Sequence, residues 1–262
     1  MTETLREIAL SAAEVQEILA QCGSSALLVG GQALALWAVY FNVEPVGVLS
    51  GKITSDADFI GNAQLAERLG RALNWDIWRP KFDDATPQTA KLTRAVKGGI
   101  QQIDFLSGII GLETRAIQTR AVEITLRSGI CLRVLHPLDV LESRLQNLLS
   151  LPEKRDQAGV AQANLAIAVA GRFLEQLIEG DANQRALFDA IERIAQIATN
   201  KRLSSVIVDY ELDLLAIVPT SKIEDPEFQT LRWPQITAAA REQTNRYRKR
   251  SQKKSVTAPR KS

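Results

Sequence analysis

The spacing of the apolar residues changes twice along this chain of 262 residues, and this constrains the possible folds more than any other feature. Residues 11–41 repeat at helical spacing around one short apolar run, and Ser11 with Glu14 predicts a capping box at the first helix. A further helix is expected over residues 62–73, with Asn62 near its cap. Residues 75–133 shift toward the alternation typical of strands, and from residue 137 the spacing is helical again. A half rich in strands followed by a helical half predicts an α+β (mixed α/β) fold, with a mixed sheet flanked by helices and a C-terminal helical domain.

Domain limits follow from breaks in this pattern. Leu151 and Pro152 interrupt the helical spacing, so we predict one domain over residues 1–150 and a helical domain over residues 151–240. Residues 241–262 contain few large apolar side chains and form a third region. Within the helical domain the spacing predicts helices over the ranges 156–179, 183–199 and 211–217.

The third region is strongly basic. It holds nine Lys and Arg residues and one acid, a net charge of +8, which leaves 2 − 8 = −6 for residues 1–240. A segment of this composition is expected to be disordered when free. It favours either a non-specific clamp on nucleic acid through phosphate neutralisation or a solubilising terminus.

Composition excludes several kinds of site. Cys22 and Cys131 lie far apart with no CxxC motif, so neither a disulfide framework nor a thiolate zinc site is expected. His136 is the one histidine, and before Pro137 at a helix start it favours a capping or packing role over that of a base. No apolar run approaches the roughly 20 residues that span a bilayer. The opening residues lack a secretion signal, so we expect a cytoplasmic protein without a membrane partner.

A glycine pair follows the first apolar run. The run SALLV reads as a buried strand, Gly30 and Gly31 follow it, and QALALWAVYF reads as a helix. Amides at a helix N-terminus can receive an anion, and glycine permits close approach of the backbone. The element predicts a phosphate-binding turn, and the alternative is a tight turn without a ligand. Lys52, in the loop over residues 43–55, either reaches over a nucleotide or is a solvated loop lysine.

Three aspartates carry the chemistry that the sequence offers. Asp56 and Asp58 lie on a predicted strand, where positions i and i+2 project from the same face. Two carboxylates so close repel unless a cation neutralises them, and Mg²⁺, or Mn²⁺ in its place, suits such oxygen ligands. Asp104 lies within a second apolar strand, so the three could hold two ions for an in-line displacement. The alternative is that Asp56 caps a turn and Asp104 pairs with a basic neighbour.

The combination of these motifs resembles the polymerase-beta-like nucleotidyltransferase superfamily. LLVGGQALALW is similar to its Gly-Gly/Ser motif at a helix start, TSDADFIG to its Asp-x-Asp strand, and QIDFLSG to the strand of its third acid. The stretch LHPLDVLESRLQNLLSLPEKRDQAGVAQA is similar to the helical segment of abortive-infection toxins and related uncharacterised nucleotidyltransferases. The resemblance covers roughly residues 25–180 and implies a nucleotidyltransferase-like fold with the site in the cleft between the domains.

The resemblance also implies roles for individual residues. The diglycine, with Gln32 where many members have serine or threonine, would bind nucleotide phosphates, and Asp56 and Asp58 would bind both metal ions. Asp104 would hold the catalytic ion and help to deprotonate the acceptor hydroxyl. The later helical motif is occupied either by Arg144 or by Lys154, Arg155 and Asp156, and its basic residues would contact the nucleotide.

Several functions remain open at this point. The resemblance implies transfer of a nucleoside monophosphate from an NTP to a hydroxyl, and its toxin members imply an RNA 3′ end as acceptor and a cognate antitoxin as partner. The acidic charge of residues 1–240 instead favours a cationic small molecule, as in aminoglycoside nucleotidyltransferases. A third possibility is a non-catalytic member of the fold that binds nucleic acid or a partner of a toxin–antitoxin pair. One of Lys91, Arg94 and Lys97 is expected near the triphosphate.

Overall fold

A computed structural model describes residues 6–50, 53–54, 56–81, 83–84, 86–180 and 184–257, with side chains as far as residue 253. The chain divides into two compact units, unit 1 (Met1–Ser143) and unit 2 (Arg144–Ser262). Helix α5 (Pro137–Ser150) runs across this division, and the domain limits given by the sequence stay predictions. In the described part of the chain, no helix combines the length and apolarity that a bilayer crossing requires.

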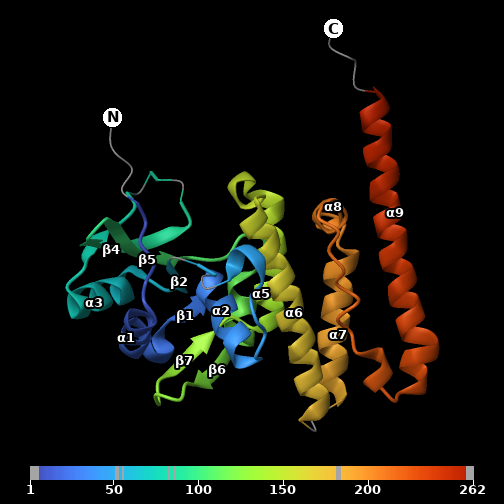
Figure 1. The fold of residues 1–262 in the computed structure, drawn as a ribbon, viewed down its shortest axis with the longest axis horizontal. Coiled ribbons are helices and arrows are strands. Elements are labelled where there is room, and N and C mark those ends of the chain that lie inside the picture. Colours follow the sequence, from blue (N-terminus) through green and yellow to red (C-terminus); the bar gives the residue numbers. More distant parts are fainter. Residues whose placement is uncertain are drawn as a thin grey trace. The chain divides into compact units, whose positions relative to one another are not determined.

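Unit 1 contains a seven-stranded mixed sheet, which confirms the predicted fold class (Figure 1). Its strands lie in the order β3-β4-β5-β2-β1-β7-β6. The pairs β2–β5 and β1–β7 are parallel and the others antiparallel. In chain order the strands are β1 (Leu27–Val29), β2 (Ala57–Ile60), β3 (Asp76–Trp78), β4 (Gln88–Val96), β5 (Gly99–Leu106), β6 (Val122–Thr125) and β7 (Cys131–Val134).

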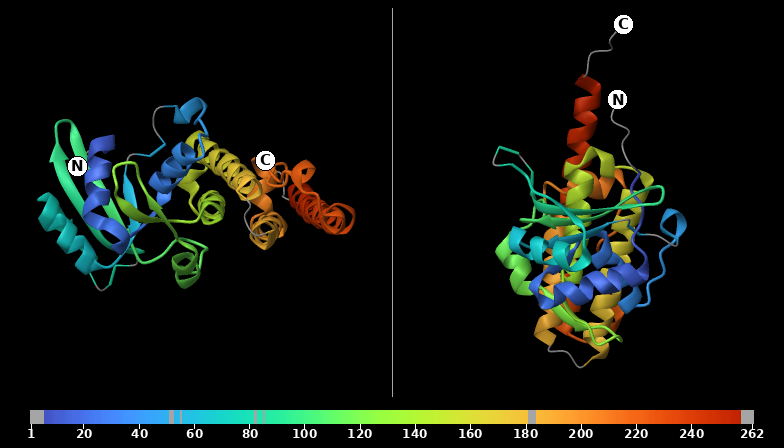
Figure 2. Two further views of the ribbon diagram at one scale, coloured as in Figure 1. Left: turned by 90° about the horizontal axis from the view of Figure 1, so that it is seen from below. Right: turned by 90° about the vertical axis from the view of Figure 1, so that its left-hand side faces the viewer.

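One face of this sheet is apolar and covered by helices. Phe59 of β2 and Phe105 of β5 stack with ring centroids 5.7 Å apart, and both are buried. Helix α3 (Ala63–Leu73) packs on this face, where an added Cβ at Gly70 would lie 3.2 Å from the side chain of Leu92 on β4. Helix α1 (Ala12–Cys22) contacts α3, as the two views of Figures 1 and 2 also show. The opposite face is therefore the one that can present polar side chains.

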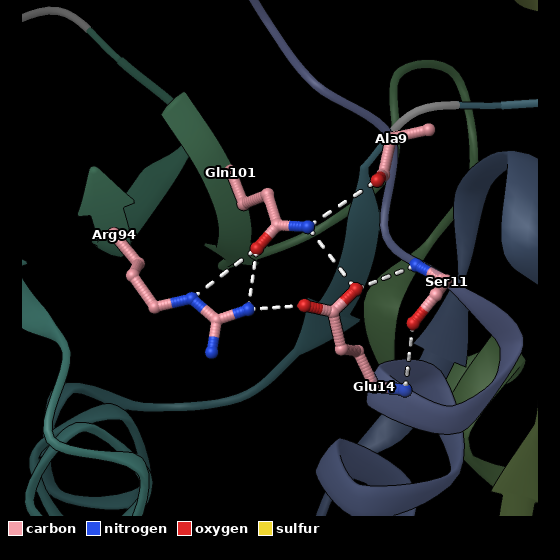
Figure 3. A network of polar contacts seen from close by, with 5 residues as sticks. All are labelled: Ala9, Ser11, Glu14, Arg94 and Gln101. Carbon is pink, nitrogen blue, oxygen red and sulfur yellow. Dashed lines mark hydrogen bonds and ion pairs between the residues drawn. The ribbon is translucent and has the colours of Figure 1, made fainter. Parts of the chain in front are cut away.

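The start of α1 is tied to the hairpin of β4 and β5 by a polar network (Figure 3). Ser11 and Glu14 form the capping box that the sequence indicates: the Ser11 amide donates to Glu14 at 2.7 Å and the Glu14 amide donates to the Ser11 hydroxyl at 3.3 Å. Glu14 also pairs with Arg94 and accepts a hydrogen bond from the Gln101 amide at 3.1 Å. Arg94 is thus committed to the fold, with its guanidinium also 4.7 Å from the centre of the Trp75 ring.

The remaining helices of unit 1 connect its strands. Helix α2 (Gly30–Tyr40) follows β1 directly, and α3 begins at the predicted cap, where Asn62 accepts from the Leu65 amide at 2.9 Å. The sequence pattern did not indicate α4 (Thr114–Arg120), whose Glu113 cap accepts from two amides. Before α5, the Leu138 amide donates to His136 Nδ1 at 3.2 Å, which confirms the predicted capping role of this histidine.

Unit 2 is helical, as the period of its sequence predicts. Its helices beyond α5 are α6 (Gln157–Glu179), α7 (Gln184–Thr199), α8 (Ser204–Asp209) and α9 (Trp233–Thr257). The helix predicted around residues 211–217 is wrong: this segment is irregular, and the helix lies earlier, in α8. Within this segment the Asp213 carboxylate accepts hydrogen bonds from the amides of Leu215 and Ala216, which stabilises a turn instead of a helix.

The basic C-terminal region differs from its prediction as a disordered tail. Residues 241–257 continue helix α9, and residues 258–262 lie outside the described part of the chain. Two contacts fix this helix to α8: the Gln243 amide donates to the Ser204 hydroxyl at 2.9 Å, and the Tyr247 hydroxyl donates to an Asp209 carboxylate oxygen at 2.9 Å. Composition alone does not reveal such contacts, because they depend on where α8 lies.

Candidate functional site

Three carboxylates gather on the face of the sheet that α1 and α3 do not cover. β2 and β5 pair in parallel so that Asp58 stands opposite Asp104, and Asp56 lies two residues before Asp58. Alternation along a strand places positions 56 and 58 on one face, and residues paired across strands share a face. Each of the three aspartates offers one oxygen, and these oxygens all lie within 4.8 Å of one another.

Asp104 is the buried member of the cluster and is held at both oxygens. The Gln88 amide donates to Oδ1 at 2.7 Å, and the Gln102 amide donates to Oδ2 at 3.3 Å. The ammonium of Lys91, which stands opposite Asp104 in the register of β4 and β5, lies 3.6 Å from Oδ1. An ionised carboxylate has about four acceptor positions, so Asp104 keeps capacity for a further ligand.

The electrostatics of Asp104 reflect this position. Burial raises the pKa of its carboxyl above the ordinary value, and the nearby charge of Asp56 raises it further. Lys91 and the hydrogen bonds from Lys91 and Gln88 act against this, lowering the pKa without cancelling the rise. An anion is therefore held here at a free-energy cost that a bound cation would relieve.

Asp56 is oriented by a neighbour in the chain. The Thr54 hydroxyl donates to Asp56 Oδ1 at 2.5 Å. The same threonine packs against the start of α2, because a Cβ added at Gly31 would lie 2.4 Å from Thr54 Cβ. Glycine at position 31 thus lets the segment that carries Asp56 lie directly on the helix start.

Asp58 makes a still closer approach to the diglycine. Gly30 has a φ of +64°, and a Cβ added there would lie 1.9 Å from Asp58 Oδ2. Position 30 therefore requires glycine for two reasons: its backbone is left-handed, and a carboxylate lies against its Cα. Val29, the residue before it, pairs with Asp58 across β1 and β2, so the register of these strands creates the contact.

The first turn of α2 lies beside the cluster. The leading amides of a helix have no partner within the helix and lie at its positive end. Here they belong to Gly30, Gly31 and the half-buried Gln32. The helix start can bind an anion, whereas the three carboxylates beside it repel an anion. The helix start and the carboxylates can therefore bind the same phosphate only if a cation lies between the phosphate and the carboxylates.

Among the three cations expected near a triphosphate, the structure brings Lys91 to the cluster. Arg94 is engaged with Glu14 and Gln101, and Lys97 is exposed at the hairpin between β4 and β5. Lys91 is also the basic neighbour of Asp104 that the alternative interpretation of the sequence required. The ion pair and the three-carboxylate cluster coexist, so the pairing with Lys91 does not exclude the metal interpretation, which stays a prediction.

The remaining candidate residues lie outside the described part of the chain or in unit 2. Lys52 lies outside the described residues. Arg144 and Arg155 belong to unit 2 and have local contacts there: Arg144 donates to Gln162 at 3.1 Å, and Arg155 donates to the Leu148 and Leu149 carbonyls that end α5. Asp156 caps α6 by accepting from the Gly159 amide at 2.8 Å. Their contacts with a nucleotide stay predictions.

Several residues of the site were not found from the sequence. Thr54, Gln88 and Gln102 orient the carboxylates, yet each is a common polar residue without a motif. The sequence gives a weak indication of Gln102, because this residue lies two positions before Asp104 on the same strand and therefore on the same face. Gln88 had none, since it reaches Asp104 beside an irregularity in the register of β4.

The carboxylate cluster suits a divalent cation. Its three oxygens are hard donors, and one belongs to a buried carboxyl whose ionisation burial disfavours. Mg²⁺ and Mn²⁺ prefer such ligands, and the chemistry of the donors fits them better than a softer metal.

Comparison with known proteins gives only distant similarities. No family model and no curated protein sequence matches this chain. Among solved structures, JHP933 from Helicobacter pylori is similar over 92% of this chain and 94% of its own, with 15% identity and a TM-score of 0.36. The Megavirus polyadenylate synthase is similar over 67% of this chain and 37% of its own, with 14% identity and a TM-score of 0.38.

Proposed function

We propose that unit 1 is a metal-dependent nucleotidyltransferase, which moves a nucleoside monophosphate from an NTP to a hydroxyl acceptor and releases pyrophosphate. One observation carries this proposal: three carboxylates meet within 4.8 Å on the face of the sheet opposite α3, and one of them lies against the diglycine that opens a helix. Carboxylates and a phosphate-binding turn are both needed when a cation must hold a triphosphate, and neither alone would indicate this reaction.

Each residue of the site has a role in this proposal. The amides of Gly30, Gly31 and Gln32 bind phosphate oxygens at the start of α2. Asp56, Asp58 and Asp104 would hold divalent cations, which neutralise the charge of the triphosphate and align the two reacting oxygens. Asp104 would accept the proton of the acceptor hydroxyl, a role that suits a carboxyl whose pKa burial raises.

The acceptor is the finer part of the proposal. We infer an RNA 3′ end, as in toxin-type members of the resembled superfamily, where a cognate antitoxin would be the partner. The rival acceptor is a cationic small molecule of the aminoglycoside class, which the charge of −6 over residues 1–240 would attract. A non-catalytic nucleic-acid-binding protein is the outcome if no acceptor is labelled.

The test is label transfer with matched variants. The full chain is incubated with each α-labelled NTP, Mg²⁺ or Mn²⁺, and either total RNA or an aminoglycoside panel. Asp56→Asn/Asp58→Asn removes two charges while keeping the side-chain volumes and the acceptor that Thr54 uses. Asp76→Asn/Asp83→Asn removes two exposed charges from unit 1 outside the cluster and serves as control.

We expect metal-dependent labelling by the parent and the control, and a loss of at least a hundredfold in the cluster variant. Labelled RNA would identify RNA as the acceptor, and labelled aminoglycoside would show that the acceptor is a cationic small molecule instead. Labelling that the cluster variant retains in full would reject the carboxylates as the site. No label on any acceptor would reject the enzyme and leave the binding protein.

A further inference from the structure

Unit 2 contains a groove of about 610 Å³ that the reaction proposed above does not use. It runs between α9 and the segment Leu212–Ala216, and its floor includes the side chains of Leu212, Leu214 and Trp233. The indole of Trp233 is half-buried and lies against Phe228, with ring centroids 5.9 Å apart. An aromatic ring that contacts a second ring therefore lines the groove beside apolar side chains.

One wall of the groove is cationic and polar. Arg241 and Arg248 line it, and both are exposed. They lie two turns apart on α9, a separation of about 10.5 Å along the helix axis at 1.5 Å per residue. Thr244 and Asn245 lie between them and supply hydrogen-bonding groups. Asp213 also lines the groove, but its carboxylate accepts from two backbone amides of its own turn.

The charge continues beyond the groove. Residues 241–253 of α9 hold six Lys and Arg residues and one acid, a net charge of 6 − 1 = +5. On the side of the helix that faces α8, Gln243 and Tyr247 make the contacts described above. Arg246 forms an ion pair with Glu242 at 2.6 Å.

We infer that this groove binds single-stranded polynucleotide, with phosphates on Arg241 and Arg248 and a base over the Trp233 ring. Spaced guanidiniums match the repeating charge of a backbone. An aromatic ring in the same groove, about 12 Å along the helix axis before Arg241, matches an unpaired base next to the phosphates that the arginines bind. A duplex hides its bases and would leave the apolar floor against phosphates. An acidic peptide would use the cations but not the ring or the hydrogen-bonding wall.

This inference deepens the proposed function in one respect, since it makes a polynucleotide the acceptor class, and in that respect it rests on the proposed function. The groove itself belongs to unit 2 alone. Binding can therefore be measured without NTP or divalent cation, so that failure of the groove and failure of the transfer reaction are distinguishable.

The test measures binding of a fluorescent single-stranded oligoribonucleotide to the full chain over a range of salt. Arg241→Gln/Arg248→Gln is compared with Arg172→Gln/Arg185→Gln, which removes two exposed cations of unit 2 that do not line the groove. We expect the groove variant to bind at least tenfold more weakly at low salt. Its slope of log affinity against log salt should fall by about 1.4, since each phosphate contact to a single strand contributes about 0.7.

A second variant reports on the ring. Oligonucleotide binding should quench the tryptophan fluorescence of the parent, and Trp233→Phe should lose this quenching while the other three tryptophans, all in unit 1, remain. Circular dichroism checks that each variant is folded. Unchanged affinity and slope in the arginine variant would overturn the inference. Equal binding of a duplex, or equal competition by polyglutamate, would replace the single strand by a duplex or an acidic protein.

Discussion

Glycine at position 30 is set by the aspartate that lies against it. Its φ of +64° and the approach of Asp58 Oδ2 to 1.9 Å from an added Cβ make two separate demands. Gly47 needs glycine only for its left-handed backbone, because its φ is +62° and nothing lies within 4 Å of an added Cβ. Comparing substitutions at Gly30 and Gly47 therefore distinguishes the effect of backbone strain from the effect of displacing the Asp58 carboxylate.

We predict that Gly30→Ala is much more harmful than Gly47→Ala. A left-handed alanine costs about 1–2 kcal/mol of stability in both variants, and the displacement of Asp58 costs Gly30→Ala about 1–3 kcal/mol more. Denaturant unfolding gives the stabilities, and Mn²⁺ titration gives the cation affinity, which should fall only in Gly30→Ala. Equal losses in the two variants would show that the contact with Asp58 is unimportant.

Lys91 occupies the place beside Asp104 that a cation would share. Its ammonium is 3.6 Å from Asp104 Oδ1, so it repels a divalent ion bound to the same carboxylate. We predict that Lys91→Met raises Mn²⁺ affinity on the order of tenfold in the absence of nucleotide, since a nearby unit charge contributes about 1–3 kcal/mol at an intermediate dielectric. Lys97→Met, on the exposed hairpin, is the control. Weaker Mn²⁺ binding in Lys91→Met alone would contradict the prediction.

Asp104 should make the stability of the protein depend on pH. Burial raises its pKa in the folded state, so between the ordinary carboxyl pKa and this raised value the folded chain binds more protons than the unfolded chain. Stability from this group is therefore greatest in acid and is lost as pH rises through the folded pKa. We predict that Asp104→Asn raises the melting temperature of the metal-free protein at pH 8 but not at pH 4.

Thermal melts of the parent and Asp104→Asn across this pH range check the sign. Added Mn²⁺ should reverse the order at pH 8, because only the parent keeps all three carboxylates. A variant less stable than the parent at pH 8 without metal would mean that Lys91 and the two glutamine amides more than offset the burial of the charge.

At the scale of elements, an ion pair between an exposed arginine and a buried aspartate joins α4 to the start of α5. The Arg120 guanidinium donates to both carboxylate oxygens of Asp139, at 3.0 and 2.8 Å, and Asp139 is fully buried. We predict that Arg120→Met destabilises the protein by about 1–3 kcal/mol, since it removes a partly solvent-screened guanidinium from a buried carboxylate. Arg120→Met/Asp139→Asn should recover part of the loss in denaturant unfolding. A double variant as unstable as the single would reject the charge as the cause.

Local patterns in the sequence predicted most of these elements but not their assembly. The capping box of Ser11 and Glu14, the Asn62 cap and the strand–diglycine–helix element were all correctly located because each depends on neighbouring residues. The missed helix α4 is short, and its cap is a glutamate, which is less diagnostic than serine or asparagine. The extension of α9 depends on contacts with α8, which a local pattern does not contain.

The site was predictable in part for the same reason. Alternation along the strand places Asp56 and Asp58 on one face, and an acid between apolar residues singled out Asp104. That β2 and β5 are neighbours, with Asp58 opposite Asp104, is a matter of sheet order and register. So are the contributions of Gln88 and Lys91 from β4, which depend on pairing across the hairpin.

At the scale of the whole molecule, the two proposed ligands bind different units. The carboxylate cluster lies in unit 1 and the cationic groove in unit 2. We predict that Mn²⁺ slows amide hydrogen exchange in β2, β5 and the start of α2, and that a single-stranded oligonucleotide slows it in α9 and the segment Leu212–Ala216. Hydrogen exchange with each ligand alone checks this. Protection of α9 by Mn²⁺ alone would contradict the assignment of the ligands.

The carboxylate of Asp58 lying on the bare Cα of Gly30 also has an evolutionary consequence. A homologue that still needs Asp58 cannot have a larger residue at position 30. A homologue that has lost this aspartate no longer has the steric requirement for glycine there, and only the requirement of the left-handed backbone remains. Alanine or serine at position 30 should thus arise after the aspartate is replaced, and its presence in a homologue would mark a descendant that has abandoned the chemistry while keeping the scaffold.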